Sequence, residues 1–310
     1  MNGLSASTTR AYEGRLNALV KYLKDAGIEY NLFELQKTEG ARQVINWFKS
    51  DNIKYKNHET LKVVLSALLW KVQKTSDGYQ LFHAYFTEVK KVCIANARKQ
   101  ELPENRKSNY LTKTELLEAY QKCYMEMIQG NEDYHNWLVL ALYALQPPVR
   151  ADYCNMKIFA FRSAQTFDRE NNYCSLGGSD NSFFLFQKYK TAKTYGSVQV
   201  PIHPDIVGYI TGRFIQKKEE YVLPPSWTPA YLSERVKTVC KKYTGKECSI
   251  GLIRHAWVFD LYKTNPTLAQ KEELARCMLH SVAVQELYRT NETPVAEIAS
   301  PADSSDSETI

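Results

Sequence analysis

Apolar residues recur at steps of three and four between residues 12 and 93, and this spacing is the strongest constraint on the fold. Residues 12–23, 44–48, 61–72 and 82–93 each carry one such stripe. Because an α-helix has about 3.6 residues per turn, each stripe covers one face of a helix. Four amphipathic helices joined by short polar loops predict a small helical bundle.

A polar stretch interrupts this periodicity and divides the chain. Residues 98–110 are rich in charge, contain Pro103 and show no apolar stripe, which is typical of a linker. We therefore expect a first domain over 1–97 and a second over 111–291. The remaining segment, 292–310, is acidic and rich in Ser and Pro, so it is expected to be disordered or to dock onto a neighbouring subunit.

The second domain combines helices with a pair of strands. Helices are expected at 111–130 and 133–146, and the latter ends because the Pro147–Pro148 pair cannot continue it. Residues 182–187 and 197–202 indicate two strands of a β-hairpin with a long connection. Further helices are expected at 205–220, 229–243, 251–262, 268–279 and 282–290. The predicted fold class is mainly α with a small antiparallel β-sheet.

Composition limits the classes of protein to consider. The net charge of +6 understates the basicity of the folded part, because five acidic residues and no Lys or Arg follow Asn291. A basic folded part fits a polyanionic partner. No apolar run approaches the roughly 20 residues of a membrane span, and no signal peptide is recognisable. The seven cysteines are scattered without a CxxC pair, which indicates reduced thiols and no zinc site. We expect an intracellular protein with no membrane partner.

Four segments of the second domain carry the functional signal. They are PPVRADYCNMKI (147–158), KYKTAKTYGSVQVPI (188–202), GLIRHAW (251–257) and LARCMLHSVAVQELYRT (274–290). Together they resemble, in order and spacing, the catalytic domain of tyrosine recombinases, the family of phage-type integrases. The bundle resembles that family's core-binding, DNA-contacting domain more loosely. The residues that match the family's active site are Arg150, Lys193, Arg254, His280 and Tyr288.

The resemblance implies a cofactor-independent enzyme that cleaves and rejoins DNA strands through a 3′-phosphotyrosine. Tyr288 is then the nucleophile, and the covalent bond conserves the energy needed for resealing. Arg150 and Arg254 are then a clamp on the non-bridging oxygens, where negative charge gathers during in-line displacement. No carboxylate cluster accompanies these residues and the arginines already supply positive charge, so no metal is expected.

Two further roles follow from the same resemblance. His280 is expected to donate a hydrogen bond to a non-bridging oxygen. Lys193 is expected to protonate the leaving 5′ oxygen, an effect worth about 10²–10⁴ in rate for general acids. Lys190 lies three residues earlier in the same connection and is the alternative for this role, with Lys193 favoured.

The chain departs from the family pattern at two points. Gly251 stands three residues before Arg254, where the family usually has His or Lys. The missing contact has to be supplied elsewhere, and His255 is the candidate, although its side chain is expected to point away from that of Arg254. The gap of eight residues between His280 and Tyr288 is one shorter than usual. Both departures resemble integrases of virus-like and transposon-like elements in eukaryotes, which implies viral or mobile-element integration.

The implied partners are double-stranded DNA and further copies of the chain, a tetramer on two DNA sites, in the nucleus or cytoplasm of a host. Two other functions stay open. A type IB topoisomerase shares this chemistry but relaxes supercoils, and a non-catalytic DNA-binding relative could carry Gly251 as a sign of decay. Four lysines of the second domain are candidates for phosphate contact, although each also fits a solvated surface: Lys188, Lys237, Lys241 and Lys242.

Overall fold

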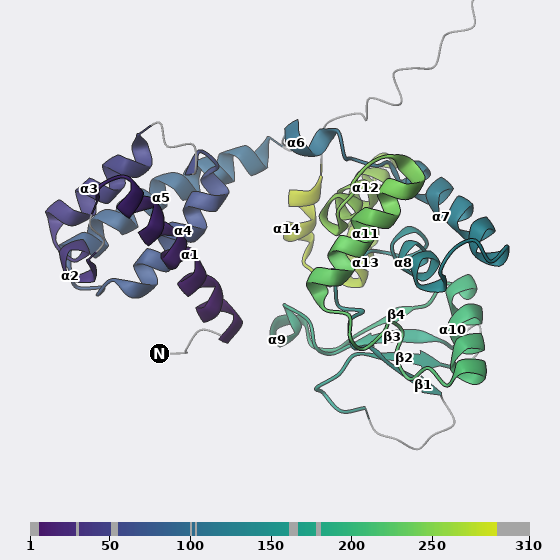
Figure 1. Cartoon of the computed structure of the whole chain (residues 1–310). Helices are drawn as coiled ribbons and strands as arrows, with labels where there is room; N and C mark the ends of the chain where they lie inside the picture. The colour runs from purple at the N-terminus through teal and green to yellow at the C-terminus, as the bar shows by residue number, and fades with distance from the viewer. Residues whose placement is uncertain are drawn as a thin grey trace, which may run out of the picture. The chain divides into compact units, whose positions relative to one another are not determined.

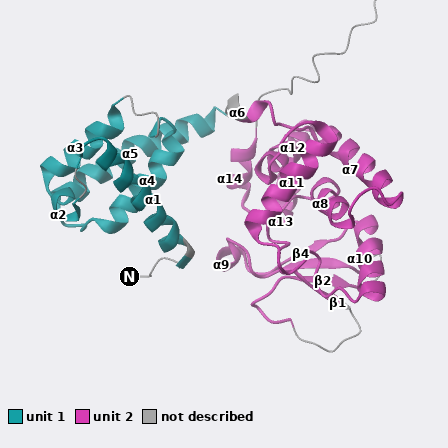
Figure 2. Ribbon diagram, in the orientation of Figure 1, with its two compact units in different colours: residues 1–99 teal, residues 100–310 magenta. Residues whose placement is uncertain are grey.

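The computed structural model describes residues 6–28, 31–50, 55–99, 101–102, 104–160, 167–177 and 181–289. It separates into two compact units, residues 1–99 and 100–310 (Figure 2). The acidic segment predicted at 292–310 lies outside the described residues. Among the described helices, none is both long enough and apolar enough to cross a membrane.

The first unit is a bundle of helices, as the apolar stripes predict (Figure 1). Asn57 caps α4 by accepting from the backbone of Glu59 and Thr60, and Ser76 caps α5 by accepting from Tyr79. The single-turn helix α2 was not predicted, because four residues are too short to show periodicity. The helices are α1 (Ala6–Asp25), α2 (Leu32–Leu35), α3 (Thr38–Lys49), α4 (His58–Lys71) and α5 (Asp77–Arg98).

The predicted linker contributes to the second unit. Residues 104–107 form the short helix α6 (Glu104–Lys107), and Leu102 and Tyr110 are each only 6% exposed within the core of that unit. Two isolated apolar residues in a charged stretch show no periodicity, so this packing could not be predicted from the local pattern.

The helices of the second unit follow the predicted order closely. Both proline-bearing helices, α10 and α11, start with proline in the first turn, where its missing N–H costs little. α8 is buried from Trp137 to Ala144 and forms the centre of the core. The bounds are α7 (Lys113–Ile128), α8 (Tyr134–Ala144), α9 (Ala192–Tyr195), α10 (Pro204–Lys217), α11 (Pro229–Thr244), α12 (Ile250–Tyr262), α13 (Leu268–Cys277) and α14 (Val282–Gln285), followed by the 3₁₀ turn η2 (Glu286–Tyr288).

A four-stranded sheet completes this unit (Figure 1). Its strands are β1 (Lys157–Ala160), β2 (Tyr173–Leu176), β3 (Phe183–Phe186) and β4 (Val198–Pro201), in the order β1-β2-β3-β4. The predicted hairpin is confirmed, since β3 and β4 pair antiparallel with Phe186 opposite Val198. The fold class is also confirmed, but the sheet is mixed rather than wholly antiparallel, because β1 runs parallel to β2. Neither β1 nor β2 was predicted; β2 is buried at all four positions and so shows no alternation.

Candidate active site

Arg254 is a buried arginine on the largely apolar helix α12. α12 begins after Ser249, whose hydroxyl accepts from the backbone N–H of Leu252 at 3.3 Å. Five apolar residues of this helix are buried, namely Ile250, Leu252, Ile253, Ala256 and Val258. Arg254 lies among them and is only 1% exposed. Its Nη1 donates to the carbonyl oxygens of Pro148 at 2.6 Å and Met278 at 3.1 Å. Burial lowers the pKa of this guanidinium, which nevertheless stays charged at neutral pH.

His280 reaches Arg254 through an unusual backbone turn. Leu279 has a φ of 57°, a left-handed conformation uncommon for any residue with a Cβ, and it ends α13. The next residue, His280, is 5% exposed and places Nδ1 2.8 Å from Nη2 of Arg254. Burial and the nearby charges of Arg254 and Arg150 lower the pKa of His280 to about 3. The imidazole is therefore neutral near pH 7.

The tautomer of His280 follows from its partner. A guanidinium has no acceptor, so Nδ1 must accept and the single proton lies on Nε2. Nε2 of His280 and Nε of Arg254 are both buried without a hydrogen-bond partner in the described part of the chain. Buried donors are normally paired, so these two N–H groups are candidates to donate to a bound anion.

Tyr288 lies beside these two side chains. The guanidinium carbon of Arg254 is 4.9 Å from the centroid of its ring, and the His280 ring is 5.5 Å from it. Ser281 begins α14 by accepting from the backbone of Val284 at 3.2 Å. The helix predicted over 282–290 instead tightens into the turn η2, at whose end Tyr288 is half-buried.

Arg150 lines a cavity of about 500 Å³ together with Arg254 and Tyr288. Arg150, Asp152, Gly251, Arg254 and Tyr288 are among the residues that line it. The backbone of Arg150 is held on both sides: its carbonyl accepts from the Tyr143 hydroxyl at 2.6 Å, and its N–H donates to Asp152 at 3.2 Å. Sequence reasoning missed Tyr143, because nothing in a buried apolar helix distinguishes one tyrosine. Burial raises the pKa of Asp152 although the charge of Arg150 opposes the shift.

Lys193 does not line this cavity. It is exposed on the short helix α9, within the β3–β4 connection, and its ammonium makes no hydrogen bond or ion pair with any described residue. The same connection is tethered near the site, because the Thr191 hydroxyl donates to the carbonyl of Leu279 at 3.2 Å. Lys190 is exposed as well. The assignment of the general acid to Lys193 rather than Lys190 stays a prediction.

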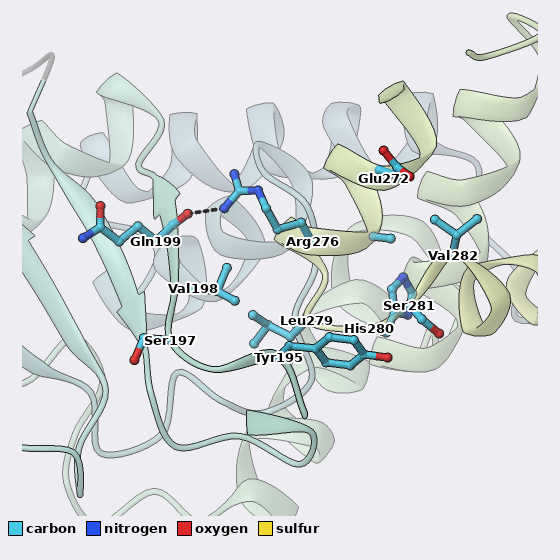
Figure 3. A pocket seen from close by; sticks show the side chains of 11 residues that line it. Tyr195, Ser197, Val198, Gln199, Glu272, Arg276, Leu279, His280, Ser281 and Val282 are labelled. Carbon is cyan, nitrogen blue, oxygen red and sulfur yellow. Dashed lines mark hydrogen bonds between the residues drawn. The ribbon is translucent and has the colours of Figure 1, made fainter. Parts of the chain in front are cut away.

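A second cavity of about 380 Å³ is lined in part by His280 (Figure 3). Tyr195 and Val198 from the β3–β4 region line it together with His280 and Ser281. Nη1 of Arg276 donates to the carbonyl of Gln199 at 2.6 Å, which joins α13 to β4 at one wall. This bond helps to set the position of the segment that leads into His280.

His255 and Gly251 differ in their relation to the site. Gly251 lines the larger cavity, and a Cβ on it would meet only the Ser249 hydroxyl, at 3.7 Å. His255 is not among the lining residues; its Nδ1 lies 2.7 Å from the backbone carbonyl of Tyr288. The described contact of His255 is therefore with the backbone of Tyr288 and not with the space beside Gly251, where the family usually has a basic residue.

Three of the four lysines proposed to contact DNA are engaged within the protein. Lys237 pairs with Glu234 at 2.9 Å and Lys241 with Glu247 at 2.6 Å. Lys242 contacts Glu126 and Glu132, each at 2.8 Å. Lys188 is exposed, and its ammonium makes no ion pair with the described residues. Lys188 is therefore the most available of the set.

The described residues contain no group of three or more His, Cys, Asp or Glu placed to hold a metal ion. The charges around the larger cavity come from arginines, with Asp152 as the acidic member of its wall. This composition suits an anion with bidentate oxygen acceptors.

No protein-family model and no curated protein matches the sequence. Among solved structures, the chain is similar to one described as the crystal structure of XerA recombinase, with 12% sequence identity and a TM-score of 0.42. The alignment covers 95% of this chain and 91% of that one. The functional assignment therefore rests on the site itself and on the motifs.

Proposed function

We propose that the chain is a tyrosine recombinase that cleaves and rejoins DNA through Tyr288. The observation that carries the proposal is the position of the Tyr288 ring, 4.9 Å from the Arg254 guanidinium carbon and beside a cavity that Arg150 also lines. A phenol beside one guanidinium, in a cavity that a second arginine also lines, is suited to attack a phosphodiester, because the cations neutralise the phosphate and stabilise the charge that develops on its oxygens.

The covalent step is a displacement at phosphorus. The phenolic oxygen of Tyr288 forms a bond to phosphorus and releases its proton to solvent, while the bond to the 5′ oxygen breaks. Lys193, or Lys190 in its place, gives a proton to the departing 5′ oxygen. The products are a 3′-phosphotyrosine and a free 5′ hydroxyl, and the reverse attack by a 5′ hydroxyl reseals the strand. No external energy source is consumed.

The orphan donors give the phosphate its recognition elements. In this proposal the Nε–H of Arg254 and the Nε2–H of His280 donate to non-bridging oxygens, and Arg150, which lines the same cavity as Arg254, completes the clamp. Fixed donors in a buried site cost no reorganisation as negative charge develops, which is how such sites stabilise a transition state.

The finer parts of the assignment are proposals of the same kind. Strand exchange requires two DNA duplexes, and we propose a tetramer of the chain on two sites, acting where host DNA is found. We assign the activity to integration of a viral or mobile genetic element, on the basis of Gly251 and the short interval before Tyr288. Lys188 is the lysine proposed to contact DNA phosphate.

The direct test is formation of a covalent adduct. The protein is incubated with a pool of short duplexes that carry a nick near a randomised sequence, so that the short cleaved strand diffuses away. Denaturing gels should show an SDS-resistant protein–DNA adduct, and sequencing of the trapped DNA should reveal the target. Tyr288→Phe should abolish the adduct, while Tyr231→Phe, an exposed tyrosine on α11, should not.

Other outcomes would contradict the proposal. Absence of an adduct from the wild-type protein, with DNA binding retained, would identify a non-catalytic DNA-binding protein. Adduct formation together with relaxation of supercoiled plasmid by monomers, and no exchange between two duplexes, would identify a type IB topoisomerase.

A further inference from the structure

We infer that His255 is a positioning residue for the nucleophile: it holds the backbone of Tyr288 so that the phenol meets phosphorus at the correct angle. The inference rests on the proposed function, because it concerns the same site. His255 does not line the cavity and so acts only through Tyr288.

The contact defines which nitrogen carries the proton. Nδ1 of His255 lies 2.7 Å from the carbonyl oxygen of Tyr288. A carbonyl oxygen can only accept, so Nδ1 must donate. The His255 ring also packs edge-on against the Tyr288 ring, with centroids 5.0 Å apart and planes inclined at 69°. One side chain therefore restrains both the backbone and the ring of the same tyrosine.

The contact is stable near neutral pH. Burial lowers the pKa of His255 to about 4, and the charges of Arg106 and Arg254 act in the same direction. The hydrogen bond to Tyr288 opposes that shift without reversing it. His255 is therefore neutral near pH 7, with its one proton on Nδ1.

α12 links the nucleophile to the arginine clamp. Arg254 and His255 are consecutive, so their side chains leave the helix about 100° apart, one to the cavity and one to η2. Two turns later Tyr262 donates to Glu286, and Lys271 lies 3.7 Å from the same carboxylate. The turn that carries Tyr288 is thus anchored at two points on one helix face, and the helix that carries the clamp sets the position of the phenol.

Loss of the anchor should reduce the rate of attack without changing recognition of DNA. A misplacement of about 1 Å can cost about 10²-fold in rate, because the reacting atoms must be aligned. The amide of Asn can place a donor near the position of Nδ1, whereas the donor of Gln extends one bond further. His255→Phe keeps a ring and removes the donor.

The experiment compares His255→Asn, His255→Gln and His255→Phe for the rate of adduct formation on the nicked target duplex. Each variant is also tested on a duplex with a 5′-bridging phosphorothiolate, which leaves without a proton. We expect His255→Phe to be slower by about 10–100-fold on both substrates. His255→Asn should stay within about threefold of wild type, and His255→Gln should lie between them. DNA affinity should be unchanged, and amide exchange over 286–289 should be faster in His255→Phe.

Equal rates in His255→Phe and wild type, or His255→Gln faster than His255→Asn, would overturn the inference. Recovery of His255→Phe on the phosphorothiolate would assign His255 to leaving-group protonation instead. If His255→Phe does not fold, the Asn and Gln variants decide alone. Absence of an adduct from the wild-type protein would refute the proposed function. Even then, slower amide exchange over 286–289 in the wild-type protein than in His255→Gln would support the contact between His255 and the Tyr288 backbone.

Discussion

Nη2 of Arg254 donates a hydrogen bond to Nδ1 of His280 over 2.8 Å, and both side chains are almost wholly buried. This contact fixes the tautomer of His280 and directs its only N–H through Nε2. It also joins α12 to the segment between α13 and α14, which leads into Tyr288. A charged arginine thereby stabilises the geometry of the candidate site.

His280, which is buried, and His255, which is partly buried, should make the free energy of unfolding depend on pH. The pKa is about 3 for His280 and about 4 for His255, below the usual value near 6.5 in an unfolded chain. Between these values the unfolded state binds protons that the folded state does not. Above about pH 6.5 these histidines should therefore not reduce the free energy of unfolding. Below that pH the free energy of unfolding should fall as pH decreases, by at most about 1.4 kcal/mol per pH unit for each histidine.

Urea unfolding at about pH 7.5 and about pH 5.5 measures this dependence, since the lower value lies about one unit below the unfolded pKa. Replacement of either histidine by Asn should flatten the dependence. Higher stability at the lower pH in the wild-type protein would contradict the assignment of two neutral imidazoles.

The two arginines of the proposed clamp should respond differently to removal. Arg254→Ala leaves the carbonyls of Pro148 and Met278 without a donor, and a buried unpaired polar group costs about 1–3 kcal/mol. Arg150→Ala removes a side chain that has no hydrogen bond among the described residues. We expect both variants to lose the adduct, but only Arg254→Ala to lose several kcal/mol of stability. Chemical denaturation distinguishes them; equal destabilisation would contradict this division.

The general acid can be identified by the leaving group. Lys193→Ala should lower cleavage of an ordinary phosphodiester by about 10²–10⁴ and leave cleavage of a 5′-bridging phosphorothiolate almost unchanged. Lys190→Ala is the matched control in the same connection. If only Lys190→Ala loses cleavage of the phosphodiester and keeps cleavage of the phosphorothiolate, Lys190 is the general acid. If Lys193→Ala loses cleavage of both substrates equally, Lys193 is not the general acid.

The open space at Gly251 should accept a longer side chain. A Cβ there has only the Ser249 hydroxyl within 4 Å, at 3.7 Å, and the residue lies in the first turn of α12. Gly251→Lys should fold, and the cation should add a contact to the phosphate and tighten DNA binding. Gly208→Lys is the control, because its Cβ on α10 also meets no atom within 4 Å but it is not among the lining residues of the cavity. Equal effects of both variants on affinity would show a nonspecific charge effect.

Lysines that are paired within the protein should contribute little to DNA binding. Lys188→Ala should reduce the slope of log affinity against log salt concentration by about 0.9, the value for one phosphate contact. Lys242→Ala should leave this slope unchanged. It should instead lower the free energy of unfolding. Burial alone would raise the pKa of Glu132. Hydrogen bonds from Lys242 and Tyr243 lower this pKa to about 2 instead. A salt slope that falls in Lys242→Ala and not in Lys188→Ala would reverse these assignments.

Local patterns predicted much of the architecture. Stripes at helical spacing predicted α1, α3, α4 and α5, and the Pro147–Pro148 pair marked the end of the preceding helix. The two segments 182–187 and 197–202, which flank a connection that contains Gly196, predicted β3 and β4. These predictions succeed because the spacing of apolar residues along an amphipathic element shows which of its faces will be buried.

At the candidate site, motifs selected residues that the structure brings together, but they did not predict the position of every side chain. Motif order selected Arg150, Arg254, His280 and Tyr288, and the structure brings the two arginines and the tyrosine around one cavity with His280 against Arg254. It leaves Lys193 exposed, outside that cavity. The motif could not indicate this, since the position of a side chain in a long connection depends on what the connection packs against.

The amino-acid sequence alone determined the longer helices and the β3–β4 hairpin, and it supplied the candidate site residues. Only the tertiary structure decided that His255 contacts the backbone of Tyr288, that His280 accepts from Arg254, and that Lys242 is neutralised by two glutamates. These contacts join residues that are between 26 and 116 positions apart in the chain. No local spacing encodes them, because they arise only when packing of the apolar faces brings distant elements together and excludes the water that would otherwise compete for each polar group.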